Sequence, residues 1–341
     1  MSANTLSKIT GIPKERYLDV GAGSNYSTIE GAVEKLINIA PDPGDEFYIR
    51  LADAAYQLVD GEVYLPENSG IISGRTDVKP VITGTSGRTQ SQGCFNVSSN
   101  NLYYGFKVVS DPTGSGSAFR SEAGTTGDIR FQNVETSDDG DDSFYLFGGG
   151  DYYFDGCDIN VGWDGIAVFG SDAVQNINIS NTHIRGLSTA SNILIRVDND
   201  NAVVNVDKSF LTLRNATARN IGTFGACVGS GLSGLGAVAY DLNVSNSIIK
   251  SHNSVPPQAI ASATSAIIKN TGRMDIDNTD IITVNELTAA ENANQDAALW
   301  LEGVADLSTG ITDTRIHNDA STLALSQIDK GSNTVTGFKI T

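Results

Sequence analysis

The sequence contains little cysteine: three residues in 341, at Cys94, Cys157 and Cys227. Their number is odd, they lie far apart, and none belongs to a C-x-x-C pair, so neither a disulfide framework nor a zinc site is expected. The three histidines share no motif. No Ser-His-Asp order, phosphate loop or cofactor fingerprint is present, and we expect no metal and no cofactor.

Positive charge is also scarce. Lys and Arg number 22 against 40 Asp and Glu, which gives a net charge of −18 at pH 7. Because phosphate binding needs a cationic face, we expect no nucleic-acid partner. No apolar run reaches about 18 residues, so we expect no membrane insertion. Residues 1–8 lack the apolar core of a secretory signal, which predicts synthesis in a cytoplasm.

What the sequence does contain is a repeat. An apolar anchor is followed two positions later by a small or amide residue and five positions later by an aliphatic one, as in Ile179, Asn181 and Ile184. The ten anchors are Ile72, Tyr103, Phe131, Phe154, Ile179, Val206, Val244, Ile276, Ile311 and Val335. The residues two after them are Gly74, Gly105, Asn133, Gly156, Asn181, Lys208, Asn246, Asn278, Asp313 and Gly337.

Gly, Asn and Asp are the residues that most readily adopt a positive φ, so each copy predicts a strand, a one-residue corner and a second strand. Apolar residues alternate with polar ones in steps of two, and no copy has a helix-length stripe, which excludes helical repeats. The frames of leucine-rich repeats and propeller blades are absent as well. The sequence therefore predicts an all-β fold, a single-stranded parallel β-helix of about ten rungs over residues 21–341, preceded by an N-terminal arm at 1–20.

A short capping helix is expected at about 27–40. Ser27 to Glu30 forms a capping-box motif, and Ile29, Val33, Leu36 and Ile37 follow on one helical stripe. Such a helix would cover the apolar end of the β-helix and its unpaired strand edges. Residues 47–51 and 63–65 alternate as strands and lead to the first rung.

Asn25 to Val33, followed by a strand and a Gly-rich corner, resembles the start of pectin methylesterases and related pectate-lyase-like proteins. This resemblance implies a right-handed β-helix. Asp142 to Gly148, followed by Phe154, Cys157 and Ile159, is similar to the segment that carries the nucleophilic aspartate of those esterases, with Asp142 displaced by one inserted residue. The family's glutamine-aspartate segment and its later arginine are missing here, so the activity is not carried over.

Acidic residues on neighbouring predicted rungs are the candidates for catalysis: Asp141, Asp142 and Asp164. Paired carboxylates about 5 to 10 Å apart would suit glycoside hydrolysis. Trp163, beside Asp164, could stack on a sugar ring. The alternative is that these acidic turns are solvated surface, which a chain of this composition favours.

Two segments, residues 220–240 and 255–268, carry no charge. Exposed loops are usually polar, so these segments indicate contact with another chain. We expect a homotrimer whose interface includes Phe224, Leu232 and Leu235.

The first functional hypothesis is a non-enzymatic surface protein of a bacteriophage virion, assembled in the host cytoplasm, with the larger viral assembly and a host glycan as partners. Head fibres, short spikes and capsid decoration proteins include β-helices that the sequence resembles. The alternative is a polysaccharide lyase or glycoside hydrolase of the tailspike type, and a third hypothesis is a glycan-binding module without activity.

Overall fold

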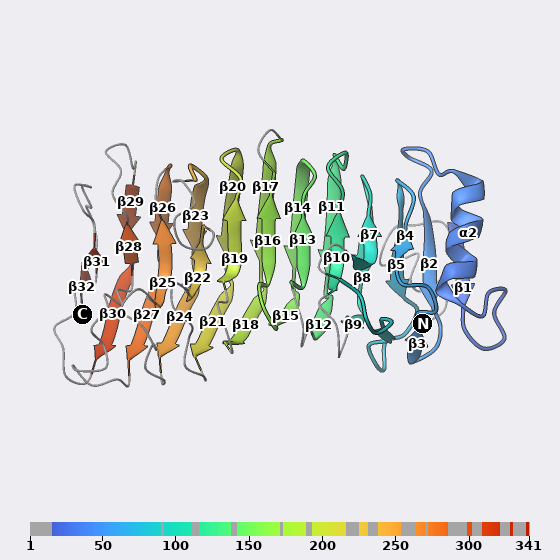
Figure 1. The fold of residues 1–341 in the computed structure, drawn as a ribbon, viewed down its shortest axis with the longest axis horizontal. Helices are drawn as coiled ribbons and strands as arrows, with labels where there is room; N and C mark the ends of the chain where they lie inside the picture. The colour runs from blue at the N-terminus through green and yellow to red at the C-terminus, as the bar shows by residue number, and fades with distance from the viewer. Residues whose placement is uncertain are drawn as a thin grey trace. The chain divides into compact units, whose positions relative to one another are not determined.

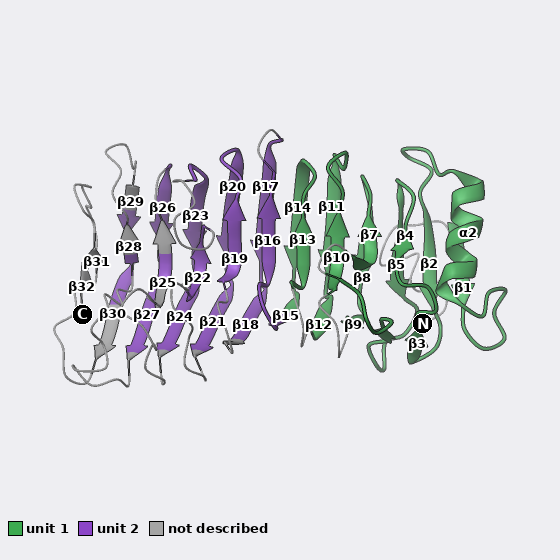
Figure 2. Ribbon diagram, viewed as in Figure 1, with its two compact units in different colours: residues 1–158 green, residues 159–341 purple. Residues whose placement is uncertain are grey.

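A computed structural model of the chain describes residues 16–89, 92–110, 116–137, 142–170, 173–188, 193–215, 225–230, 238–253, 264–269, 272–285, 299–301, 309–320, 328–329 and 339–340. Across these ranges the chain is all-β apart from one helix, α2 (Ile29–Ile39) (Figure 1). It forms two compact units, residues 1–158 and 159–341 (Figure 2). Each unit consists of three parallel sheets, so the predicted parallel β-helix is confirmed.

The sheets of unit 1 are named A1, B1 and C1. Sheet A1 contains β1 (Tyr17–Val20), β2 (Phe47–Leu51), β5 (Ser69–Ser73), β8 (Leu102–Tyr104), β11 (Asp128–Gln132) and β14 (Gly150–Asp155). Sheet B1 contains β3 (Ala55–Gln57), β6 (Val81–Thr83), β9 (Lys107–Val109) and β12 (Glu135–Ser137). Sheet C1 contains β4 (Val63–Tyr64), β7 (Gly93–Val97), β10 (Ser117–Ser121) and β13 (Phe144–Leu146). The boundary between the units falls within β15 (Asp158–Val161).

The sheets of unit 2 are named A2, B2 and C2. Sheet A2 contains β17 (Gln175–Ser180), β20 (Ala202–Asp207), β23 (Asp241–Ser245), β26 (Met274–Asp277) and β29 (Thr309–Thr312). Sheet B2 contains β18 (His183–Ser188), β21 (Phe210–Asn215), β24 (Ile248–Asn253), β27 (Asp280–Asn285), β30 (Arg315–Ala320) and β32 (Lys339–Ile340). Sheet C2 contains β16 (Ile166–Phe169), β19 (Ile193–Asp198), β22 (Gly225–Gly229), β25 (Thr264–Lys269), β28 (Leu299–Leu301) and β31 (Ile328–Asp329).

Aromatic rings fill the interior of unit 1 in two columns. In one column Phe119 stacks on Phe144 with ring centroids 5.0 Å apart. In the other, Phe131 stacks on Phe154, also at 5.0 Å. The columns meet edge to face, with Phe131 and Phe144 4.8 Å apart. Offset stacks and edge-to-face contacts are the arrangements that aromatic pairs prefer, so the anchors form one continuous core.

The register confirms most of the predicted anchors. Tyr103 pairs with Phe131 and Phe131 with Phe154 in unit 1, and the anchors from Ile179 to Ile311 pair in the same way in unit 2. The first anchor is wrong by one residue, because Ile71 and not Ile72 lies beside Tyr103. Val335 lies outside the described residues.

Eight of the predicted corners have the left-handed backbone that the repeat requires, with φ between 45° and 75°. They are Gly105, Asn133, Gly156, Asn181, Lys208, Asn246, Asn278 and Asp313. Gly74 lacks this backbone conformation, because the first anchor is Ile71 and the predicted corner is therefore also displaced by one residue. In this first rung the inward aliphatic residue of the second strand is Ile82, which pairs with Val108 of the next rung. Gly337 lies outside the described residues.

Helix α2 contacts β1, β2 and β4 and covers the end of unit 1 (Figure 1). Its N-cap is Thr28, whose hydroxyl accepts a hydrogen bond of 3.2 Å from the Gly31 N–H. Glu30 does not close the expected capping box, because its carboxylate accepts a bond of 2.7 Å from the Val59 N–H instead. Ile29, Val33 and Leu36 are buried as predicted, whereas Ile37 is 55% exposed.

The last part of the N-terminal arm expected at 1–20 is a strand of sheet A1. Residues 17–20 form β1, which pairs in parallel with β2. Residues 1–15 lie outside the described part of the chain. The strands expected at 47–51 and 63–65 correspond to β2 and β4.

Candidate functional site

The outer faces of sheets A1 and A2 differ in character. Along A2, inward apolar residues alternate with outward polar ones, as in β17, where Ile177 and Ile179 are buried and Asn178 is half-buried. Sheet A1 breaks this alternation. An apolar cluster lies on its outer face, and we call it the outer cluster: Tyr17, Tyr48, Ile72, Leu102 and Tyr104. Tyr48 and Ile72 are buried in this cluster, and Tyr17, Leu102 and Tyr104 are partly buried around them.

A cleft of about 380 Å³ adjoins the outer cluster at the start of the strands. It is lined by Pro43, Glu46, Tyr48, Asn68, Asn100, Asn101, Leu102, Asp128 and Arg130. Gly70 lies between Tyr48 and Leu102 in the register, and a Cβ there would be 1.9 Å from the Leu102 carbonyl oxygen. Tyr48 and Leu102 form an apolar floor in a cleft whose lining is otherwise mostly amide and charged groups.

Two asparagines hold the rim of this cleft. Asn68 and Asn100 have φ of 55° and 60°, a conformation that asparagine tolerates at a tight corner. The Asn100 amide donates a bond of 2.9 Å to the Asn68 side-chain oxygen, and the Asn68 amide donates one of 3.0 Å to the Pro41 carbonyl. These bonds fix the amides along the edge of the sheet.

Arg130 supplies the positive charge of the cleft. Its guanidinium donates a bond of 2.6 Å to the Asp128 carboxylate and lies 5.0 Å from the centroid of the Tyr153 ring. About half of the side chain is exposed, so N–H groups remain available to a ligand. Burial, and next the Glu46 carboxylate, raise the pKa of Tyr48 to about 12, which keeps its phenol protonated at neutral pH.

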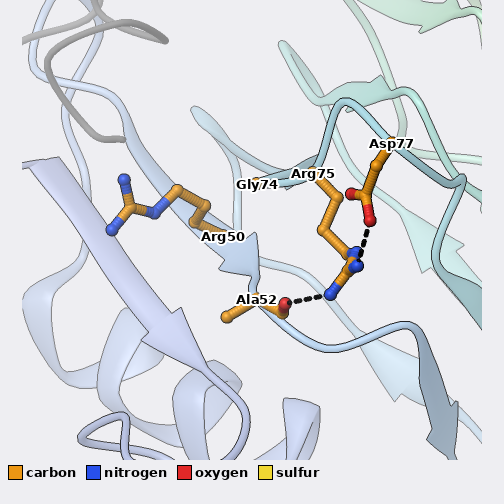
Figure 3. Close-up of a pocket in the computed structure, with 5 residues that line it drawn as sticks. All are labelled: Arg50, Ala52, Gly74, Arg75 and Asp77. Atoms are coloured by element: carbon orange, nitrogen blue, oxygen red, sulfur yellow. Dashed lines mark hydrogen bonds and ion pairs between the residues drawn. The ribbon is translucent and has the colours of Figure 1, made fainter. Parts of the chain in front are cut away.

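A second pocket, of about 250 Å³, lies at the other end of the same strands (Figure 3). It is lined by Arg50, Ala52, Gly74, Arg75 and Asp77. The Arg75 guanidinium points toward Asp77 and the Ala52 carbonyl oxygen and bonds to both, whereas the Arg50 guanidinium points away from them. Arg50 is bound instead by both carboxylate oxygens of Asp19, at 2.5 and 2.6 Å.

The carboxylates that the sequence suggested for catalysis are buried where the structure describes them. Asp164 accepts a bond of 2.9 Å from the Ile193 N–H and one of 3.2 Å from Arg196, so both oxygens are occupied. Burial outweighs Arg196 and raises the pKa of Asp164 to about 6. Arg196 also pairs with Asp198 at 2.7 Å. Asp164 is therefore part of a buried ion-pair network and not an acid open to a substrate.

Neither of the two pockets above is lined by Asp142 or Trp163. Asp142 is 5% exposed and lies just before β13, and Trp163 is half-buried in the turn before β16. Asp141 lies outside the described residues, as do Phe224, Leu232 and Leu235. Sequence reasoning did not identify the residues of the cleft. A signal for the adjoining outer cluster existed, because adjacent apolar residues such as Ile71-Ile72 do not fit a strand with one polar face.

Among the described residues, no group of three or more His, Cys, Asp or Glu could hold a metal ion. The same part of the chain includes no helix that is long and apolar enough to span a membrane. All three cysteines are buried thiols outside any disulfide.

A comparison with protein-family models finds no match, and neither does one with the sequences of characterised proteins. Among solved structures, the chain is similar to the A-module of mannuronan C-5 epimerase AlgE4 of Azotobacter vinelandii, with 13% identity, 94% of each chain covered and a TM-score of 0.45. It is similar to carrot pectin methylesterase, with 13% identity, 93% of this chain and 88% of that chain covered, and a TM-score of 0.41. Tailspike protein 3 of bacteriophage CBA120 has 13% identity, with 87% of this chain and 47% of that chain covered, and a TM-score of 0.39. All three are parallel β-helix proteins, and the similarity concerns the fold.

Proposed function

We propose that this chain is a non-enzymatic surface protein that binds a polysaccharide on the outer face of sheet A1. The observation that carries the proposal is the cleft floored by Tyr48 and Leu102 and bordered by Arg130 and Asp128. A sugar ring has an apolar C–H face and a rim of hydroxyls. An apolar floor packs against the first, and guanidinium, carboxylate and amide groups hydrogen-bond the second.

The face suits an extended ligand. The cleft and the Arg75 pocket lie at opposite ends of the A1 strands. A chain of sugars lying along the strands would meet polar groups at both ends. The proposal assigns no enzymatic role because Asp164 is buried and paired with Arg196, and Asp142 is buried. A buried carboxylate cannot reach a glycosidic bond.

The proposed setting is the surface of a bacteriophage virion, with the chain as a capsid decoration protein, head fibre or short spike. A rigid parallel β-helix with a glycan-binding face would serve such a role. The proposal includes a homotrimer, and the interface residues suggested by the sequence, Phe224, Leu232 and Leu235, fall outside the described residues.

The test measures binding and product release on one panel of soluble polysaccharides: alginate, polygalacturonate and dextran. We expect at least one to bind without release of shorter products, and Arg130→Ala to weaken binding about tenfold, the equivalent of about 1.4 kcal/mol. Lys107→Ala is the matched control, because Lys107 also pairs with an acidic residue, Glu135, but on the outer face of sheet B1. Product release, or equal loss in both variants, would overturn the proposal, and so would the failure of every polysaccharide to bind.

A further inference from the structure

The outer face of sheet B2 carries positive charge in an otherwise acidic chain. Inward residues such as Leu211 and Ile249 are fully buried, and the residues between them point outward. The basic outward residues are Arg185, Arg214, Lys250 and Arg315. Asp280, an acidic residue on this face, pairs with Arg315. A net charge of −18 makes this face an exception.

Two apolar side chains lie at the edge of this face where β21 and β24 begin. Phe210 and Ile248 are direct neighbours in the register and are 37% and 38% exposed. The His183 ring lies 5.0 Å from the Phe210 ring. In the described part of the chain no ion pair is formed by Arg214 or Lys250. Exposed aromatic and arginine side chains together are typical of the centre of a protein interface.

The outer face of sheet A2 has the opposite character. Its outward strand positions carry mainly amide, hydroxyl and carboxylate groups beside the apolar Val203, and the acidic ones are Asp207, Asp241, Asp275 and Asp277. Arg273, which precedes β26, pairs with Asp275 at 2.5 Å. A hollow of about 440 Å³ lies on this face, lined by Asn243, Val244, Ser245, Arg273, Asp275, Ile276, Asp277 and Thr312. Unit 2 therefore presents a basic face with an apolar ridge and an acidic face with a hollow.

We infer that the occupant of the B2 face is the A2 face of a second copy of this chain. Phe210 and Ile248 would enter the hollow, while Arg214 and Lys250 would meet Asp275 and Asp277. Opposite charges at close range steer association and fix its register. Because the two faces differ, the contact is heterologous, and such contacts build rings when the rotation between copies closes. The inference rests on the proposed homotrimer and assigns its contact to these two faces in place of Phe224, Leu232 and Leu235.

The experiment measures the mass of the full chain by light scattering at micromolar concentration, with the monomer at 35.9 kDa as reference. Wild type should give about three times this mass. Reversing the B2 face with Arg214→Glu and Lys250→Glu should yield monomer, and reversing the A2 face with Asp275→Lys and Asp277→Lys should do the same. All four substitutions together restore opposite charges at the contact, so this variant should regain the wild-type mass. Lys35→Glu with Lys79→Glu changes the net charge as much as the B2 reversal but in unit 1, and it should leave the mass unchanged.

The outcomes separate the interface from the oligomer. A monomeric wild type overturns both the homotrimer and this inference. A wild-type trimer that survives the B2 reversal overturns the inference alone. Thermal unfolding checks that each variant folds, and a folded four-fold variant that stays monomeric overturns the pairing of the two faces. If monomeric wild type binds dextran sulfate and the B2 reversal abolishes this, the face takes a polyanion and the inference is wrong.

Discussion

The side-chain amide of Asn278 donates a hydrogen bond of 2.8 Å to the side-chain oxygen of Asn246, one rung away. Asn246 in turn donates a bond of 2.8 Å to the Asp207 carboxylate. Both asparagines have a left-handed backbone, with φ of 45° and 50°. Each therefore does two things at its corner: it tolerates the backbone conformation, and it links its rung to the next.

Substitutions at Asn278 should separate these two contributions. Asn278→Gly keeps the backbone and loses the amide bond, so the free energy of unfolding should fall by about 1 kcal/mol or less. Asn278→Val loses the bond and also strains the corner, which should cost about 1 to 2 kcal/mol more. Denaturant unfolding of the two variants measures the difference. Equal stability of the two would show that the corner does not need a positive φ.

Lys208 occupies a corner of the same type with φ 47°, although lysine does not favour it. Its ammonium lies 3.4 Å from the Asp207 carboxylate on an exposed surface, where such a pair contributes little. We expect Lys208→Gly to raise the free energy of unfolding by about 1 kcal/mol, because it removes the strain. The control is Lys35→Gly in the exposed part of α2, which should lower it by about 1 kcal/mol. A fall at Lys208 in the same denaturant assay would contradict the prediction.

The sequence was sufficient for the fold because corner and anchor each have a local chemical cause. A positive φ selects Asn, Asp or Gly, and a buried strand face selects apolar residues at alternate positions. The prediction failed at the first rung, where Ile71 and Ile72 are both apolar and fully buried. One lies in the core and the other in the outer cluster, and periodicity alone cannot distinguish them.

The candidate site was harder to predict for a different reason. Tyr48, Leu102 and Arg130 come from three strands that are far apart in the sequence, and only the register brings them together. The acidic residues failed as candidates because sequence does not report burial. Asp164 looks like a solvated turn residue, yet it is buried and binds Arg196.

The capping helix offers a test with a matched control. Leu36 is fully buried against the end of unit 1, and Ile37 beside it is 55% exposed. Leu36→Asp should lower the free energy of unfolding by at least about 3 kcal/mol, since it removes a buried leucine and buries a charge. Ile37→Asp should change it by no more than about 0.5 kcal/mol. Thermal unfolding with light scattering measures stability and aggregation together, and equal behaviour of the two variants would remove the cap assignment.

The cysteines predict a pattern of chemical reactivity. Cys94, Cys157 and Cys227 are buried, and burial raises the pKa of the Cys157 and Cys227 thiols to about 12. The thiolate is the reactive form, so iodoacetamide at pH 8 should leave all three unmodified in the folded protein. In denaturant all three should react, and mass spectrometry counts the added groups. Labelling of any of them without unfolding would contradict their burial.

The buried ion pair of Asp164 and Arg196 predicts how stability depends on pH. The pKa of Asp164 is raised from 3.8 to about 6 because burial disfavours the charged carboxylate more than Arg196 favours it. Between these values the folded state binds the proton more tightly than the unfolded state does. This group therefore contributes most to stability below about pH 4, and its contribution falls as the pH rises toward 6.

Asp164→Asn isolates this contribution, because the other carboxylates titrate alike in wild type and variant. Asparagine keeps the size of the side chain and cannot ionise. We expect wild type to lose stability relative to the variant as the pH rises from 4 to 7, since burial raises the pKa of Asp164. Urea unfolding at several pH values measures the difference. The free energy of unfolding of wild type could instead stay constant relative to that of the variant, or rise, as the pH increases. Either result would mean that Arg196 outweighs burial at this site.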